Sequence, residues 1–183
     1  MKRILLIVDP QNDFITGTLA VNGAKDAIKA LNRYIKSTNY DFIAVTQDTH
    51  PKDHCSFEIN GGIWPVHCVY KTKGWKIPIY LHQTLSKQLA DFYYKGFDKN
   101  TEEFSAFPRN ELLKNHITES IENGYLSVDI CGIAGDYCVL ETLKGLMEFV
   151  PKDKIRILTE YIASIDGGIK LNDFIKENGI TKI

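Results

Sequence analysis

The chain has 183 residues, of which 44% are hydrophobic and 25% are charged, a composition that is typical of a globular domain and excludes a largely disordered chain. Its 22 Lys and Arg residues are balanced by 23 Asp and Glu residues, and the resulting formal net charge of -1 argues against a nucleic-acid-binding protein. The length is ordinary for one domain, so we expect residues 1–183 to form a single domain.

The first apolar segment is too short to be a targeting or membrane segment. Residues 4–8 form an apolar run that ends at Asp9, whereas a signal peptide needs about 7–15 apolar residues and a membrane helix about 20. We therefore expect a cytoplasmic protein without a membrane partner. In that reducing compartment the four cysteines should be free thiols. They are Cys55, Cys68, Cys131 and Cys138.

Short apolar runs alternate along the chain with segments whose apolar residues recur at helical spacing. The expected strands are 2–8, 42–46, 92–95, 126–133, 154–158 and a short edge strand at 180–183. The expected helices are 24–37, 110–121, 137–149 and 169–178. This alternation predicts right-handed βαβ units. We therefore expect an α/β fold with three layers, α/β/α, around a mostly parallel sheet of about six strands.

The segment 49–81 interrupts this alternation with several Gly and Pro residues. Irregular loops of that length are uncommon inside a domain and are usually functional. In open parallel sheets, ligands bind beyond the carboxyl ends of the strands. We therefore expect the reactive side chains at the strand ends and in this loop.

Four predicted strands end in polar or reactive residues. Asp9 follows the first strand, Asp48 and His50 follow the second, Lys95 ends the third, and Cys138 lies in the turn after the fourth. The carboxyl ends of parallel strands lie at one edge of a sheet, so we expect these side chains to share one crevice.

Cys138 is the candidate nucleophile. It lies in a predicted strand-to-helix turn, and Asp136 is a candidate N-cap that would place Cys138 in the first helical turn. There the helix dipole favours a thiolate, and free backbone N–H groups can stabilise an oxyanion. The simpler alternatives are that Cys138 is a small buried hydrophobe, Lys95 a surface residue and Asp9 a turn residue. Together, however, these residues supply what amide or ester cleavage by a thiol requires.

A second group combines one carboxylate with three imidazoles. Its members are Asp48, His50, His54 and His67. In extended backbone, positions 48 and 50 face the same side, and this N/O ligand set suits Zn²⁺, Fe²⁺ or Mn²⁺.

Two other interpretations of that group stay open from spacing alone. The residues can be turn-stabilising polar groups, or they can form a closed structural zinc site with Cys55 and Cys68. Nearby, Phe14 and Trp64 are either core residues or flat walls for an aromatic substrate. The Gly- and Pro-rich surroundings of Trp64 favour the wall.

Five ordered motifs resemble the nicotinamidase branch of the isochorismatase-like cysteine hydrolases. They are residues 8–14, 48–57, 64–68, 95–107 with its Lys-Gly and Phe-Ser-Ala-Phe sequences, and 132–139. The resemblance spans nearly the whole chain and implies the isochorismatase-like hydrolase fold. It also implies a catalytic triad of Asp9, Lys95 and Cys138.

The same resemblance assigns roles to the other residues. Asp48, His50 and His67 are then direct metal ligands, and His54 binds the metal directly or through water. Ile133–Ala134 corresponds to a cis peptide bond of the family, with the N–H groups of Ala134 and Cys138 as the oxyanion hole. Phe14 and Trp64 correspond to the walls of a pyridine pocket.

The implied activity is metal-dependent hydrolysis of nicotinamide to nicotinate and ammonia through a thioester, in NAD salvage, together with hydrolysis of pyrazinamide. The implied cofactor is a divalent metal, with Zn²⁺ named first and Fe²⁺ or Mn²⁺ as alternatives. The alternatives for function are another isochorismatase-like amidase and a non-enzymatic α/β domain with structural zinc. The sequence leaves formation of a homo-oligomer open.

Overall fold

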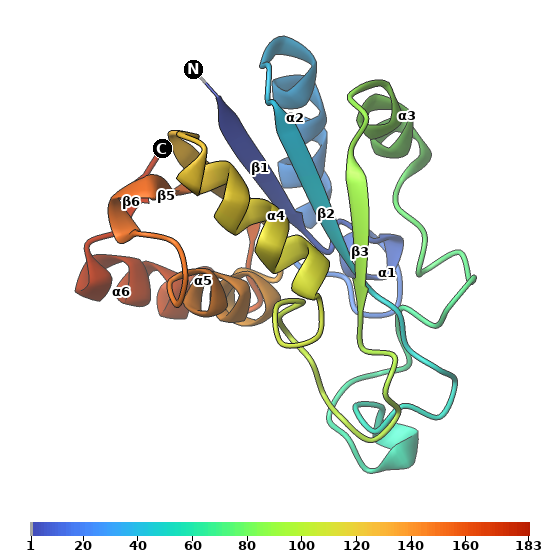
Figure 1. Cartoon of the computed structure of the whole chain (residues 1–183). Helices are drawn as coiled ribbons and strands as arrows, with labels where there is room; N and C mark the ends of the chain where they lie inside the picture. Colours follow the sequence, from blue (N-terminus) through green and yellow to red (C-terminus); the bar gives the residue numbers. More distant parts are fainter. Residues whose placement is uncertain (1) are drawn as a thin grey trace.

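Six strands form one sheet in which every neighbouring pair is parallel. The structure is a computed structural model that describes residues 2–183. The strands are β1 (Arg3–Val8), β2 (Phe42–Asp48), β3 (Asp91–Lys95), β4 (Ser127–Ile133), β5 (Ile155–Ala163) and β6 (Thr181–Lys182). Their order is β3-β2-β1-β4-β5-β6, which places β1 between the two halves of the sheet (Figure 1).

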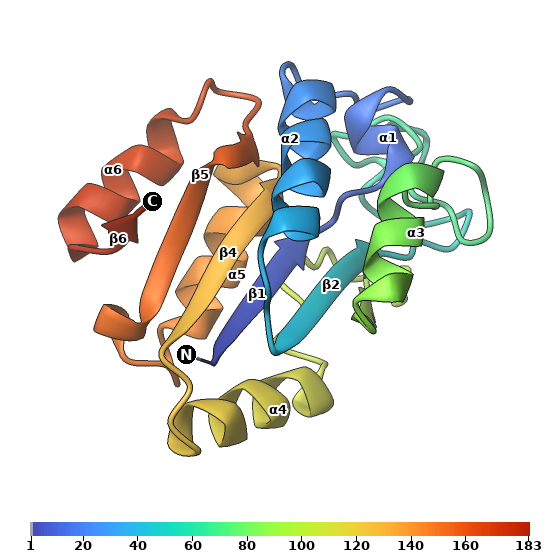
Figure 2. The ribbon, with the colours of Figure 1, turned by 90° about the horizontal axis from the view of Figure 1, so that it is seen from above.

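Helices cover both faces of this sheet. The helices are α1 (Asn12–Ile15), α2 (Ala24–Ser37), α3 (Ile79–Lys87), α4 (Glu111–Glu122), α5 (Leu140–Leu146) and α6 (Ile169–Asn178). Residues of α1, α2 and α3 pack in one hydrophobic core, and residues of α4, α5 and α6 pack in the other. In Figure 1, α4 crosses in front of the sheet and α2 lies behind it, and Figure 2 shows the same arrangement from above. The predicted three-layer α/β/α fold is confirmed.

The apolar run of β1 is continuous because both of its faces are buried. Leu5 and Ile7 belong to the core beneath α2, whereas Ile4, Leu6 and Val8 belong to the core beneath α4 and α5. Such runs are typical of central strands in parallel sheets. This burial explains why a short run without alternation predicted a strand correctly.

Several predicted boundaries are wrong in an informative way. Helices α1 and α3 were not predicted, and the long segment before α3 is mostly irregular, with a 3₁₀ turn at Glu58–Asn60. The helix expected at 137–149 is instead a π-helical turn at Gly135–Val139 followed by α5.

Asp136 does not cap this helix, contrary to our expectation. Its carboxylate accepts hydrogen bonds from the backbone N–H groups of Ile165 (2.9 Å) and Asp166 (3.1 Å). These partners lie in the loop after β5, so a contact distant in sequence displaces the local cap. Asp136 therefore ties the Cys138 turn to that loop.

The four cysteines are free thiols, as expected. Among residues 2–183, no helix is both long enough and apolar enough to cross a membrane.

The strand order fixes where a ligand site forms. The chain runs from β1 outward to β2 and β3 and then returns to the other side of β1 with β4, so the strand order reverses between β1 and β4 and a crevice opens at their carboxyl ends. Gly132 allows the two strands to approach here, because a Cβ atom at this position would lie 2.0 Å from the carbonyl oxygen of Val8.

Candidate active site

Strand register brings the predicted triad and the first metal-ligand candidate together. Asp48 and Lys95 are register partners at the ends of β2 and β3. Asp9 follows β1, and its backbone N–H donates to the carbonyl oxygen of Thr46 at 3.2 Å. Asp9 has a φ of 47°, a left-handed conformation that non-glycine residues rarely adopt and that is common at functional sites.

The Lys95 ammonium is buried at the centre of this group. It lies 2.9 Å from Asp9 Oδ2, forms an ion pair with the Asp48 carboxylate, and donates to Cys138 Sγ at 3.7 Å. It also donates to the carbonyl oxygen of Glu103 at 3.1 Å. The three residues that the sequence predicted as a triad therefore meet at one point.

Burial and charge set the protonation states of these groups. Burial alone would lower the pKa of Lys95, but Asp48 and Asp9 outweigh it and raise that pKa well above its ordinary value. Burial raises the pKa of the Cys138 thiol, and Lys95 opposes this shift. Burial also raises the pKa of Asp9. The resting site therefore favours a charged amine beside a protonated thiol.

Asp9 is placed to receive a proton. Its Oδ1 accepts a hydrogen bond from the Thr46 hydroxyl at 2.7 Å. Its Oδ2 is buried and forms an ion pair with the Lys95 ammonium at 2.9 Å. Because burial raises its pKa, the Asp9 carboxylate accepts a proton more readily than an exposed one.

Asp48, His50 and His67 form a buried group whose donor atoms all lie within 4.8 Å of one another. The Nδ1–H of His50 donates to the Gly96 carbonyl oxygen at 3.0 Å, and the Nδ1–H of His67 donates to the Pro65 carbonyl oxygen at 2.8 Å. These bonds leave both Nε2 atoms as ligands.

The free donor atoms of this group fit a divalent metal. The Nε2 atom of His50 is buried without a hydrogen-bond partner, 3.7 Å from Asp48 Oδ2. One carboxylate and two imidazoles, each held by a second hydrogen bond, are typical of zinc and related sites. Burial raises the pKa of Asp48, but Lys95 and His50 lower it more, so the carboxylate is ionised.

His54 is not brought into this group, although it lies beside it. The centroid of its ring lies 4.0 Å from that of His50, with the two ring planes tilted by 30°. However, its Nε2–H donates to the Thr101 carbonyl oxygen at 3.1 Å, and its Nδ1 lies 2.7 Å from the Ser56 hydroxyl. Burial and the neighbouring His50 lower the pKa of His54 to about 4. His54 is therefore a neutral neighbour of the three converging residues.

Gln11 holds the backbone of Asp48 in place, a function that our sequence analysis missed. Its side-chain amide donates to the Asp48 carbonyl oxygen and accepts from the Asp48 N–H, both at 2.8 Å. It also donates to the Trp75 carbonyl oxygen at 2.9 Å. Gln11 lies in the first matched motif, but nothing in its spacing predicts this contact.

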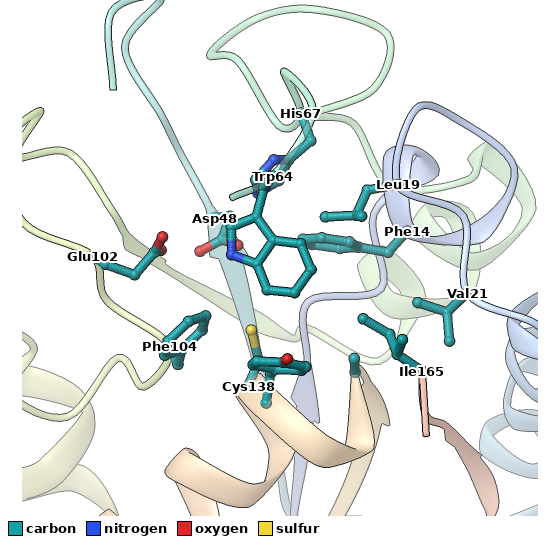
Figure 3. A pocket seen from close by; sticks show the side chains of 12 residues that line it. Phe14, Leu19, Val21, Asp48, Trp64, His67, Glu102, Phe104, Cys138 and Ile165 are labelled. Atoms are coloured by element: carbon teal, nitrogen blue, oxygen red, sulfur yellow. The ribbon is translucent and has the colours of Figure 1, made fainter. Parts of the chain in front are cut away.

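A pocket opens above Cys138. Figure 3 shows the Cys138 sulfur pointing into the space below the Trp64 ring, with Phe14 and Phe104 on either side. Half of its lining residues were predicted to belong to the site, namely Phe14, Trp64, Asp48, His67, Ala134 and Cys138. The residues missed are Leu19, Val21, Glu102, Phe104, Tyr137 and Ile165. Phe104 and Tyr137 lie within the matched motifs 95–107 and 132–139, so their place in these motifs could have indicated that they line the pocket.

The turn that carries Cys138 begins with the Ile133–Ala134 bond, which is cis, as the resemblance implied. Ala134 and Cys138 both line the pocket. By contrast, Cys131 is fully buried in β4. In the described residues, neither Cys55 nor Cys68 belongs to a group of converging metal-ligand atoms, so the geometry gives no support to the structural zinc site.

Comparisons with known proteins agree with this geometry. The model of the isochorismatase domain matches residues 3–148. The nicotinamidase of Acinetobacter baylyi is 34% identical over 161 residues, which cover 75% of this chain and 71% of that protein. The structure of a Pyrococcus horikoshii pyrazinamidase in complex with zinc matches with a TM-score of 0.81 and 29% identity, covering 100% of this chain and 99% of that chain. A yeast nicotinamidase bound to the inhibitor nicotinaldehyde matches with a TM-score of 0.84 and 26% identity, covering 99% of both chains.

Proposed function

The chain belongs to the isochorismatase family, and from this premise we propose that it hydrolyses nicotinamide to nicotinate and ammonia. One observation carries the proposal. Cys138, Lys95 and Asp9 meet beneath an aromatic-walled pocket, beside three converging metal-ligand side chains. A thiol nucleophile, a proton carrier and a flat apolar pocket are what cleavage of an aromatic carboxamide requires.

Acylation begins with transfer of the Cys138 proton to Asp9, while the Lys95 ammonium stabilises the thiolate. The sulfur attacks the carboxamide carbon, and the N–H groups of Ala134 and Cys138 stabilise the oxyanion that forms. When the carbon–nitrogen bond breaks, Asp9 returns the proton to the leaving ammonia. The product of this half-reaction is a thioester between Cys138 and the nicotinoyl group.

Deacylation uses the same residues in the same places. Asp9 takes a proton from a water molecule, which attacks the thioester carbon. The carbon–sulfur bond then breaks, and the proton returns to the Cys138 sulfur. The nicotinic acid formed gives up its carboxyl proton to solvent and leaves as nicotinate, and the enzyme returns to its resting state with Asp9 ionised and Lys95 charged.

The pyridine ring lies between Phe14 and Trp64 in this proposal, with Asp48 and His67 at the polar end of the pocket. Asp48, His50 and His67 would hold a divalent metal, and His54 would contact it at most through water because both of its ring nitrogens are engaged. A bound metal supplies a positive charge that orients the ring nitrogen. Zinc is our first candidate, with Fe²⁺ and Mn²⁺ as alternatives.

We further propose that pyrazinamide, which differs by one ring nitrogen, is also a substrate. The chain acts as one domain in NAD salvage, in the cytoplasm. The pyrazinamide proposal follows from the same pocket and the same nucleophile, and it adds no further residue to the mechanism.

The decisive experiment measures ammonia release from nicotinamide by the purified protein. We expect release that is lost with a chelator and regained when Zn²⁺, Fe²⁺ or Mn²⁺ is added. If no ammonia is released under any of these conditions, the proposed function is wrong. A parallel assay with benzamide, which lacks the ring nitrogen, tests the orientation of the ring, and we expect a much lower kcat/KM for it.

A further inference from the structure

Glu103 lies in the loop between β3 and α4 and contacts the residues that link the nucleophile to the metal-ligand group. We propose that Glu103 is a positioning residue that fixes Lys95 and His50 relative to each other. The inference rests on the proposed function, because it concerns the same site. It assigns a specific task to a residue that neither contacts Cys138 nor belongs to the metal-ligand group.

The first link joins Glu103 to two consecutive residues. Its carbonyl oxygen accepts a hydrogen bond from the Lys95 ammonium at 3.1 Å. Its carboxylate oxygen Oε2 accepts one from the backbone N–H of Gly96 at 2.8 Å. The main chain and the side chain of Glu103 therefore hold both the side chain of Lys95 and the backbone that follows it.

The second link joins Gly96 to His50. The Gly96 carbonyl oxygen accepts the Nδ1–H hydrogen bond of His50 at 3.0 Å. Gly96 has a φ of +74°, and a Cβ atom there would lie 2.6 Å from His50 Cε1. The peptide at residue 96 thus packs directly against the imidazole, and a shift of Gly96 would turn the ring and move Nε2 away from Asp48 and His67.

The third link holds the Glu103 carboxylate in place. Its other oxygen forms an ion pair with the Nε of Arg109, whose side chain is about half exposed, whereas the Glu103 side chain is 7% exposed. A buried carboxylate is costly unless it is paired and hydrogen-bonded. Arg109 and Gly96 together meet that requirement. The ion pair with Arg109 holds Glu103 on the solvent side, and the hydrogen bond from Gly96 connects it to the buried site.

The expected consequence is a change in metal affinity as well as in rate. Groups that hydrogen-bond to a ligand histidine fix the orientation of its ring, and their loss typically weakens metal binding or activity by about 10–100-fold. Here the group that contacts His50 is a backbone carbonyl, which cannot be removed by substitution. Glu103 is the side chain that holds that carbonyl in place, so it is the residue to change.

The test compares two near-isosteric variants with one control. Glu103→Met removes the acceptor for Gly96 and keeps the volume, whereas Glu103→Gln keeps an acceptor. Asp98→Asn is the matched control, because Asp98 also binds Arg109, at 3.2 Å, but its side chain is 35% exposed. Zinc affinity is measured on the folded proteins by competition with a chromogenic chelator, and kcat and KM are measured with nicotinamide.

We expect Glu103→Met to weaken zinc binding by about tenfold or more and to lower kcat with a smaller change in KM. Glu103→Gln should recover most of the zinc affinity, and Asp98→Asn should stay within about threefold of wild type in both measurements. Glu103→Ala is a second removal variant that guards against misfolding specific to Met, and thermal unfolding identifies variants that fail to fold.

Three outcomes would overturn the proposal. The first is a folded Glu103→Met or Glu103→Ala protein with wild-type zinc affinity and kcat. The second is an Asp98→Asn protein that loses as much zinc affinity as Glu103→Met. Loosening of the loop would then be sufficient to explain the loss of zinc affinity. The third is a Glu103→Gln protein no better than Glu103→Met. A wild-type protein that released no ammonia would contradict the proposed function, while the zinc affinities would still decide the task of Glu103.

Discussion

Two buried clusters in this sheet are built from the same parts. We call the first group the catalytic cluster, and it consists of Asp9, Asp48, His50, Lys95 and Cys138. In it, Asp48 on β2 and Lys95 on β3 are register partners. In the second cluster, Asp129 on β4 and Arg156 on β5 are also register partners. We call the second group the Asp129 cluster, and it consists of Asp129, Arg156, Arg3, Tyr40 and Ser127. Each cluster sets a buried carboxylate against a cation on the neighbouring parallel strand.

The clusters differ in how completely their polar atoms are hydrogen-bonded. Asp129 Oδ1 accepts from the Ser127 hydroxyl (2.9 Å) and from Arg156 Nε (2.8 Å). Its Oδ2 accepts from the Tyr40 hydroxyl and from Arg156 Nη2, both at 2.6 Å. In the catalytic cluster, by contrast, Asp9 Oδ2 has the Lys95 ammonium as its partner, at 2.9 Å, and His50 Nε2 is buried without a hydrogen-bond partner.

This difference separates stability from chemistry. A buried carboxylate whose hydrogen bonds are all made contributes to a unique fold, and removing its partners is costly in stability. A buried acceptor left without a donor costs free energy in the resting protein, and it can accept a proton or a metal during function. The comparison therefore predicts that substitutions in the catalytic cluster change the rate, whereas substitutions in the Asp129 cluster change the stability.

The largest effect should come from Cys138→Ala. We expect turnover of nicotinamide to fall by more than about 10⁴-fold, because no other group can form the thioester. The thermal midpoint and zinc affinity should stay near those of the wild type. Cys131→Ala is the control, since this thiol is fully buried in β4 and lies outside the pocket. If Cys138→Ala released ammonia at the parent rate, the nucleophile would be another residue.

Removal of the metal should abolish activity and leave the fold intact. Protein contacts already hold the ligand side chains, with His50 on Gly96 and His67 on Pro65. We expect dialysis against a chelator to change the thermal midpoint by about 2–4 °C, the shift that 1 kcal/mol produces in a domain of this size. Circular dichroism during chelation measures it. Loss of the fold on chelation would favour the structural-zinc interpretation instead.

The sequence was sufficient for the features that depend on strand ends. Asp9, Lys95 and Cys138 could be predicted because apolar runs mark the strands, and parallel strands deliver their last residues to one edge. The ordered motifs then identified the family. The continuous burial of β1 on both faces made that strand visible without any alternation.

The sequence was insufficient where one backbone segment supports another. Gln11 and Glu103 act on the backbones of Asp48 and Gly96, and such contacts leave no spacing pattern. Helix α3 was missed because it buries only Leu81, Thr84 and Leu85, too few for a clear helical period. Asp136 failed as a cap because its partners, Ile165 and Asp166, are distant in the sequence.

The Asp129 cluster should respond in the opposite way to the catalytic one. We expect Asp129→Ala to lower the free energy of unfolding by about 2–3 kcal/mol, because it leaves Arg156 and Tyr40 without their acceptor. The partial exposure of Arg156 (27%) moderates the loss. The kcat of the folded variant should match the wild type. Urea unfolding measures the loss, and Asp53→Ala, which breaks an exposed pair with Lys99, should leave stability unchanged.

The smallest expected effect concerns Tyr40, and its sign follows from the direction of its pKa shift. Burial and the hydrogen bond to Asp129 raise the pKa of Tyr40 above its ordinary value of 10.0. The unfolded chain therefore releases this proton at a lower pH than the folded protein does. The stabilising contribution is complete below pH 10 and declines as the pH rises above it.

Tyr40→Phe tests whether the Asp129 cluster depends on that proton. The variant should lose about 1 kcal/mol near neutral pH, because one hydrogen bond to a carboxylate that keeps its other donors is removed. Its free energy of unfolding should then decline less steeply between pH 9.5 and pH 11 than that of the wild type, as measured by urea unfolding at each pH. Tyr70→Phe, at an exposed tyrosine outside the cluster, is the control for the removal of a phenol group. If the slope of Tyr40→Phe equalled that of the wild type, the Tyr40 phenol would not donate to Asp129 in solution. Asp129 would then lack one of the hydrogen bonds that distinguish its cluster from the catalytic cluster.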